Sequence, residues 1–165
     1  MIIDVWNDEN SIGYIKDLRL NKTYKPGIVS CNNLVFSMDD KYVYYCKKDE
    51  NLRPYAVYWH LITERSSLKD ELLFEETDEK YFVDLCVSKD KQYFIVKCSA
   101  KESFKIFIKK REQIEWDDRF ICISKEIDNI YSIEFNNDNV FLIRKHQGTN
   151  LILKINKKKF DLFCE

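Results

Sequence analysis

The feature of this sequence that most restricts its fold is a strand-turn-strand pattern that recurs along the chain. The stretch "VFSMDDKYVYYCKK" (residues 35–48) aligns with "CVSKDKQYFIVKCS" (86–99) at an offset of 51 residues. A third copy, "IEFNNDNVFLIRKH" (133–146), follows at an offset of about 47 residues, an alignment in which Val140 corresponds to Tyr93. In each copy, apolar and aromatic stretches flank a turn rich in Asp, Asn and Lys, which suits a tight reversal between strands. A repeat of this length is the size of one four-stranded blade of a β-propeller.

Other apolar runs of five to eight residues, such as "YAVYWHL" and "FKIFIKK", also have the composition of strands. No segment shows a sustained 3.6-residue period, and residues 111–118 are expected to form a loop. We therefore predict an all-β fold, a partial β-propeller of about three four-stranded antiparallel blades. The predicted division is a partial blade over about 1–30, blades over about 31–80 and 81–130, and a further partial blade over about 131–165. Because a closed ring needs more blades than this, we expect an arc of a larger ring.

Composition narrows the classes of partner. The chain has 165 residues and a formal net charge of −1, so no global field draws it to nucleic acid or to an anionic membrane. It contains no apolar run long enough to cross a bilayer and no basic stretch of a signal peptide at its start, so we expect a cytoplasmic protein. The six cysteines lie far apart without a CxxC pair, which favours reduced thiols. We expect neither a metal site nor a cofactor.

The order of motifs resembles the propeller domain of oligopeptidase B, in the prolyl oligopeptidase family of serine peptidases. The resemblance extends from about residue 12 to residue 156, and it is strongest between residues 34 and 97. The residues that fill the family pattern are Leu52, Arg53, Pro54, Tyr55, His60, Asp70, Leu72, Leu73, Phe74, Glu75, Glu76, Asp78 and Phe82. The chain departs from this pattern at Trp59, where the family commonly has Arg, and at Ile62-Thr63, where it commonly has Gly-Thr.

The resemblance implies a lid rather than a catalytic domain. In this family the propeller covers the active site of an α/β-hydrolase domain, so that only short peptides enter. The three glycines of the chain, Gly13, Gly27 and Gly148, lie in no G-x-S-x-G motif, and we expect no catalytic residue here. The implied partners are the hydrolase domain of the parent chain and the short peptide substrates of the parent enzyme. The alternative is a free-standing β-propeller-like interaction module without peptidase activity.

Arg53 is a candidate contact to the substrate. The resemblance implies substrates that carry Arg or Lys, which carboxylates near an entrance would attract, so Glu75, Glu76 and Asp78 complete the set of candidate substrate-gating residues. Structural alternatives exist for each of them. Arg53 can pair with Asp49 or Glu50 or stack on Tyr55, and the acidic run "DELLFEETDEK" can be the solvated edge of an outer strand.

The remaining chemistry-bearing stretches have structural interpretations. His60 is expected to be a structural or surface histidine, and the Lys-rich stretch "KINKKKFDLF" is expected to be a solvated face. Because the faces of an arc are uncovered, we also expect self-association, for example two arcs that close a six-bladed pseudo-ring.

Overall fold

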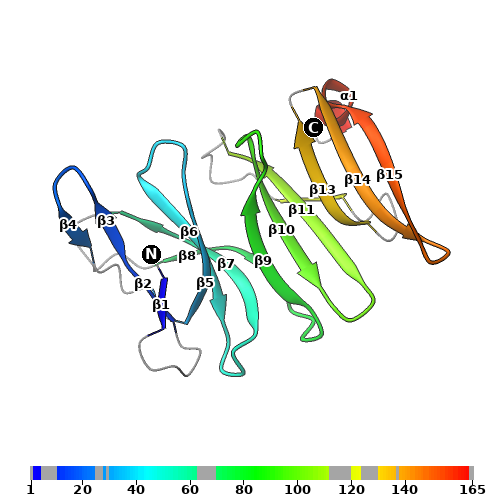
Figure 1. Ribbon diagram of the computed structural model, residues 1–165. Helices are drawn as coiled ribbons and strands as arrows, with labels where there is room; N and C mark the ends of the chain where they lie inside the picture. The colour runs from blue at the N-terminus through cyan, green and yellow to red at the C-terminus, as the bar shows by residue number, and fades with distance from the viewer. Residues whose placement is uncertain are drawn as a thin grey trace. The chain divides into compact units, whose positions relative to one another are not determined.

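Antiparallel β-strands account for almost all of the regular structure in the computed structural model of the chain (Figure 1). The residues it describes are 2–4, 11–24, 28, 30–62, 70–111, 120–123, 130–136 and 138–163. Apart from Arg111, the predicted loop over residues 111–118 lies outside them. The chain divides into two compact units, Met1–Leu85 and Cys86–Glu165.

The first unit contains two short hairpins and one four-stranded antiparallel sheet. The hairpins are formed by β1 (Ile2–Asp4) with β2 (Ser11–Gly13) and by β3 (Ile15–Asp17) with β4 (Lys22–Tyr24). The sheet follows chain order: β5 (Cys31–Phe36), β6 (Tyr42–Lys48), β7 (Pro54–Leu61) and β8 (Glu71–Glu75). The sheet contributes to an apolar core, in which Val43 and Tyr45 of β6 pack with Ile15, Ile28 and Cys31.

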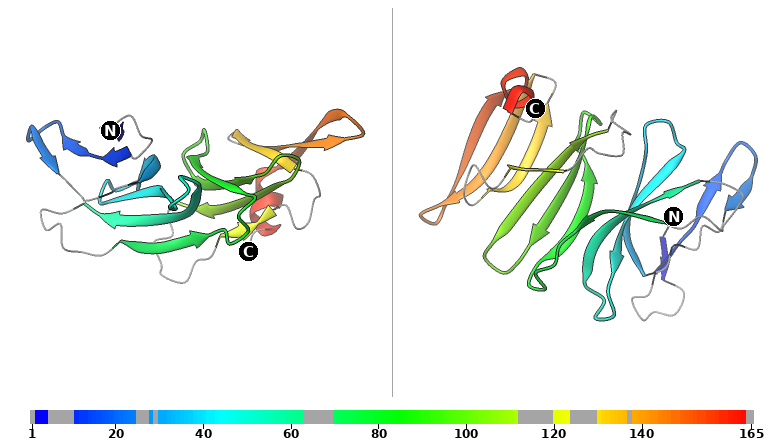
Figure 2. Two further views of the ribbon diagram at one scale, coloured as in Figure 1. Left: turned by 90° about the horizontal axis from the view of Figure 1, so that it is seen from below. Right: turned by 180° about the vertical axis from the view of Figure 1, so that it is seen from behind.

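A second four-stranded sheet also follows chain order. Its strands are β9 (Phe82–Val87), β10 (Tyr93–Ser99), β11 (Phe104–Lys110) and β12 (Ile121–Cys122). The third sheet has three strands: β13 (Ile130–Asn136), β14 (Asn139–His146) and β15 (Thr149–Asn156) (Figure 2). In the second unit, Tyr93 of β10 stacks on Phe135 of β13 with ring centroids 4.4 Å apart, and Val140 and Leu142 of β14 lie fully buried in the same cluster. The prediction of an all-β chain with the sheets of a partial propeller is confirmed.

The first two copies of the repeat have the same turn. Ser37 donates its hydroxyl to Asp39 at 2.6 Å and accepts a hydrogen bond from the backbone N–H of Tyr42 at 3.0 Å. The same two bonds, with the same two distances, recur 51 residues later at Ser88, Asp90 and Tyr93. The offset read from the sequence therefore joins residues in equivalent positions of two sheets.

The third copy is displaced by one residue from its expected alignment. The backbone N–H groups of Ile62, Arg111 and Lys157 donate to the carbonyls of Lys41, Gln92 and Asp138, one in each sheet. Because these bonds are equivalent, Asp138 corresponds to Gln92 and Val140 corresponds to Phe94. The offset between the second and third copies is therefore 46 residues rather than 47. The connection between the first two strands is also shorter in this copy: β13 ends at Asn136 and β14 begins at Asn139, whereas β9 ends at Val87 and β10 begins at Tyr93.

The helix α1 (Lys157–Phe163), which directly follows β15, was not predicted. The side chain of Asn156 caps its first turn by accepting the N–H of Lys158 at 3.1 Å. Phe160 is 2% exposed and packs edge-to-face on Phe135, with centroids 5.6 Å apart. The helix therefore completes the core of the second unit at the end of the sheet where β13 turns into β14 (Figures 1 and 2).

The expectation of a solvated Lys-rich end is wrong for Lys157. Its ammonium lies 2.5 Å from Asp90 and 2.6 Å from the side-chain oxygen of Gln92, and the side chains of the ion pair are only 11% and 5% exposed. Burial raises the pKa of Asp90, but the hydrogen bonds from Lys157 and Ser88 outweigh it, and the net pKa lies below the ordinary value. The lysines that follow, Lys158 and Lys159, are exposed as expected.

Candidate functional site

The turn between β6 and β7 is built around the carboxylate of Asp49. This carboxylate accepts the backbone N–H groups of Asn51 at 2.9 Å and Arg53 at 3.0 Å, while Leu52 takes a left-handed conformation with φ of 61°. Pro54, which has no N–H to donate, opens β7 as the sequence predicted. The turn therefore delivers the Arg53 side chain from a fixed backbone.

Arg53 fastens this turn to the loop that follows β8. Its Nε lies 2.9 Å from the Asp49 carboxylate, and its Nη1 donates to the backbone carbonyls of Tyr81 at 3.1 Å, Asp78 at 3.3 Å and Glu76 at 3.5 Å. The guanidinium also lies 5.8 Å from the ring centroid of Tyr55. Pairing with Asp49 and stacking on Tyr55, the structural alternatives for Arg53, are both present. With its side chain 12% exposed, Arg53 holds two backbone segments together.

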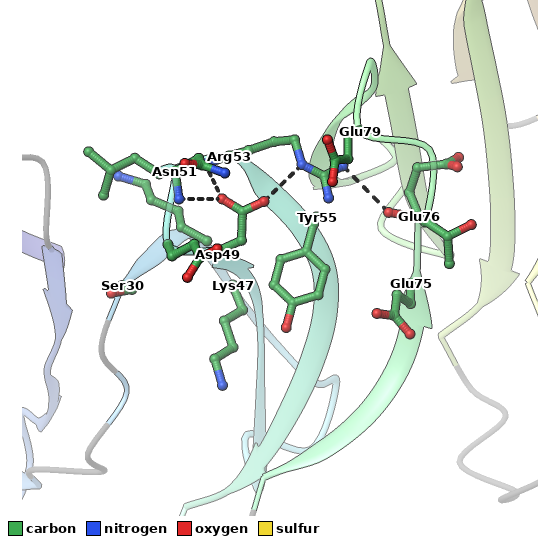
Figure 3. Close-up of a pocket in the computed structure, with 13 residues that line it drawn as sticks. Ser30, Lys47, Asp49, Asn51, Arg53, Tyr55, Glu75, Glu76 and Glu79 are labelled. Atoms are coloured by element: carbon green, nitrogen blue, oxygen red, sulfur yellow. Dashed lines mark hydrogen bonds and ion pairs between the residues drawn. The ribbon is translucent and has the colours of Figure 1, made fainter.

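These two segments enclose a hollow of about 870 Å³ (Figure 3). Three of the four candidate gating residues, Arg53, Glu75 and Glu76, line it. The fourth, Asp78, is not among the lining residues: its carboxylate lies 3.0 Å from Lys80, and its carbonyl accepts from Arg53. The structure therefore brings most of the candidate set to one place.

The carboxylates of the hollow differ in exposure. Glu75 and Glu79 are exposed, whereas Glu76 is 6% exposed and accepts the backbone N–H of Asp78 at 3.1 Å. Glu76 therefore shapes the loop, whereas Glu75, Glu79 and Glu50, which is also exposed, are available to a ligand in solution. Counted together, the lining holds five carboxylates against three cationic side chains.

Sequence reasoning did not single out Tyr55 or Lys47 as part of this site, and it considered Glu79 only as a member of the acidic run. Figure 3 shows the Tyr55 ring in the middle of the hollow, with Lys47 and Glu75 on either side of it. Lys47 lies 5.0 Å from the ring centroid of Tyr58. Burial, followed by a hydrogen bond with Tyr55, raises the pKa of Tyr58 to about 12. For Tyr55 the available signal was its position two residues beyond Arg53, at the start of β7.

His60 belongs to a separate, buried network. Its Nδ1 lies 2.5 Å from one oxygen of Asp70, and the hydroxyl of Tyr45 donates to the other oxygen. Burial raises the pKa of Asp70, but the bonds from His60 and Tyr45 hold it below its ordinary value. Of the two roles expected for His60, structural or surface, a ring that is 2% exposed agrees with the structural one and not with the surface one. Its partner Asp70, which precedes β8, was not anticipated.

Metal-binding clusters and membrane-spanning helices are both absent from the part of the chain that the structure describes. These residues contain no group of three or more His, Cys, Asp or Glu side chains placed to hold a metal ion. They also contain no helix with the length and apolar character needed to span a bilayer.

Comparisons with known proteins identify the family. The family model for the prolyl oligopeptidase N-terminal β-propeller domain matches residues 7–155. The structure is similar to oligopeptidase B from Leishmania major, with a TM-score of 0.77 at 15% sequence identity over 95% of this chain and 22% of that one. It is also similar to the closed form of oligopeptidase B from Trypanosoma brucei with covalently bound antipain, with a TM-score of 0.61 at 14% identity over 76% of this chain and 18% of that one. No curated protein matches the sequence.

The chain thus spans about a fifth of the length of the peptidases whose fold it shares. Because the family model covers most of the sequence, the chain belongs to the prolyl oligopeptidase family, as a part of its N-terminal β-propeller domain.

Proposed function

We propose that the chain is a non-catalytic propeller segment of an oligopeptidase B-like serine peptidase, and that it gates the access of short peptides to a hydrolase domain. Its partners are then the hydrolase domain of the parent chain and the peptides that this domain cleaves. The observation that carries the proposal is the Arg53-braced hollow, whose wall presents the exposed carboxylates of Glu75 and Glu79.

The charges of the hollow support a preference for cationic peptides. Arg53 and Asp49 compensate each other at 2.9 Å, which leaves more carboxylates than ammonium groups around the Tyr55 ring. An excess of carboxylates around an aromatic ring favours an Arg or Lys side chain through charge and cation–π attraction. Such a field falls off over about 8 Å at physiological salt, so it selects peptides only at the hollow itself.

A binding assay with a short fluorogenic peptide that contains two basic residues tests this proposal. We expect salt-sensitive binding without turnover, and a double substitution Glu75→Gln and Glu79→Gln weakens it roughly two- to tenfold because two exposed charge contacts are lost. The control is Glu71→Gln, which removes one negative charge from an exposed position of β8 outside the hollow and is compared with each single substitution, Glu75→Gln and Glu79→Gln. A second control replaces the basic residues of the peptide with Gln.

Two results contradict the proposal. Turnover that a serine-hydrolase inhibitor abolishes would show that the chain is itself a peptidase. If the double substitution leaves peptide binding unchanged, the carboxylates of the hollow do not select peptides. In the second case the alternative, a free-standing interaction module, gains support.

We also propose a cytoplasmic location. It is supported by the sequence, in which the six cysteines lie far apart without a CxxC pair, a pattern that favours reduced thiols.

A further inference from the structure

The sheet of the first unit has opposite charges at the two ends of one row of paired residues. Lys47 of β6 pairs with Ala56 of β7, and Ala56 pairs with Glu75 of β8. Residues that pair directly share a face of the sheet, so Lys47 and Glu75 lie on one face with their Cα atoms two strand spacings, about 10 Å, apart. Both side chains line the hollow that Arg53 braces.

Neither of these two charges is compensated by an ion pair within the described part of the chain. The ion pairs there join other residues, and the Asp49 carboxylate of the same hollow pairs with Arg53. The strand between Lys47 and Glu75 contributes Ala56, whose methyl group compensates neither charge. Glu75 is exposed and Lys47 is half-buried, so a ligand in the hollow can reach both.

Two tyrosines lie beside these charges. Figure 3 shows the Tyr55 ring with Lys47 on one side of it and Glu75 on the other. The Lys47 ammonium lies 5.0 Å from the ring centroid of Tyr58. Burial, followed by the hydrogen bond with Tyr55 and the charge of Glu75, raises the pKa of Tyr58 to about 12, so this phenol keeps its proton at neutral pH. The row therefore combines a cation, an anion and aromatic surface.

We infer that the hollow binds a peptide whose last residue is Arg or Lys with a free α-carboxylate. Lys47 receives the carboxylate, Glu75 receives the side-chain cation, and the Tyr55 ring contacts the chain between them. This selection rests on the proposed function, because it names the part of a peptide that the hollow recognises.

The separation of the two protein charges favours this class of ligand over other zwitterions. The α-ammonium and α-carboxylate of a single amino acid are attached to one carbon, which suits two protein groups that already lie together. Lys47 and Glu75 instead start about 10 Å apart at their Cα atoms and form no ion pair with each other. In a C-terminal Arg or Lys, the length of the side chain separates the cation from the carboxylate. A peptide amide leaves Lys47 without a partner and adds a cation that it repels.

Two peptides that differ only at the C-terminus test the inference. They are Ala-Ala-Arg with a free carboxylate and the same peptide as its amide, titrated into the full chain by calorimetry. We expect the free carboxylate to improve binding roughly two- to fivefold, the size of a solvent-accessible charge contact. The amide has the greater positive charge, so a general attraction to the carboxylates of the hollow would favour it instead. Ala-Ala-Gln with a free carboxylate measures the contribution of the side-chain cation.

Two substitutions assign the two ends of the ligand. Lys47→Met should abolish the preference for the carboxylate and keep the preference for Arg over Gln, because Met removes the charge but retains an unbranched chain beside Tyr58. Glu75→Gln should do the reverse. The control, Lys41→Met, removes a positive charge at a 69% exposed position outside the hollow and should change neither preference. Thermal midpoints check that each variant keeps its fold.

Failure of this inference and failure of the proposed function give different results. If basic peptides bind but the amide binds as tightly as the free carboxylate, the inference is refuted while selection of cationic peptides stands. A carboxylate preference that Lys47→Met leaves intact refutes the role of Lys47. If none of the peptides binds, both the inference and the proposed function fail.

Discussion

Arg53 illustrates how much of this site is determined by single side chains. A guanidinium has several donors in a fixed plane, and here they reach one carboxylate and three carbonyls of a different loop. The loop residues Glu76 and Asp78 thereby keep their backbone positions beside β7. The carboxylates of the hollow owe their arrangement to a residue that need not touch a ligand.

Replacing Arg53 should therefore destabilise the first unit and loosen this loop. We expect Arg53→Ala to lower the free energy of unfolding by about 2–4 kcal/mol, because charged hydrogen bonds are lost and Asp49 keeps a partly buried charge without its partner. Arg53→Lys should recover part of the loss, since a single ammonium reaches fewer acceptors. Denaturant titration, with hydrogen exchange at residues 78–81, measures both effects.

The control for this prediction is Lys41→Ala. Lys41 pairs with Asp39 at 3.3 Å but is 69% exposed, and such surface pairs contribute about 0–1 kcal/mol. If Arg53→Ala proves no more costly than Lys41→Ala, the bracing role of Arg53 is refuted.

At the scale of elements, the strands were predictable and the helix was not. The apolar alternation and the Asp-containing turns placed β6, β7, β10, β11, β14 and β15 correctly, because strand pairing and burial follow that pattern directly. The helix α1 has seven residues, which is fewer than two full turns. A segment this short does not show a recognisable helical period in the sequence. Its main signal was local: Asn156 as a cap before three lysines, followed by a single apolar anchor, Phe160.

The candidate site was predictable to a similar degree. Asp49 and Arg53 lie four residues apart in one turn, so their pairing could be anticipated from the sequence. Arg53 also contacts carbonyls that lie 23 to 28 residues away in the sequence. These contacts depend on how β8 pairs with β7, and a local sequence pattern does not predict that pairing. The same holds for the bond between His60 and Asp70.

Removal of the Phe160 ring tests whether α1 is part of the core of the second unit. Phe160→Ala should lower the stability of this unit by about 3–5 kcal/mol, the usual cost of emptying a buried aromatic site. Lys159→Ala, at an exposed position of the same helix, should change it little. Equal effects of the two substitutions on denaturant unfolding would show that the helix is not docked.

At the scale of the whole molecule, the account depends on successive sheets that repeat one pattern. The repeat is visible in bonds as well as in residues, since Ser37 and Ser88 make the same pair of contacts. The third copy keeps the pattern with a shorter connection, and its offset from the second copy is 46 rather than 47 residues. The difference matters because a slip of one residue exchanges the two faces of a strand.

The fold and the family are thus secured over most of the chain, while the gating role stays a proposal. Family membership follows from residues 7–155, and the similar structures extend well beyond this chain. The predicted blade boundaries, about 1–30, 31–80, 81–130 and 131–165, also stay a prediction.

The most direct test of this account is the register of the three repeats in solution, measured by interstrand nuclear Overhauser effects. The structure predicts that Val43 pairs with His60, Phe94 with Lys109 and Val140 with Ile155, three equivalent pairs in three sheets. Finding all three pairs would establish the repeated sheets and the offsets of 51 and 46. Finding Phe141 opposite Ile155, or no antiparallel pairing at one of these sites, would contradict the claim that the three sheets repeat one pattern.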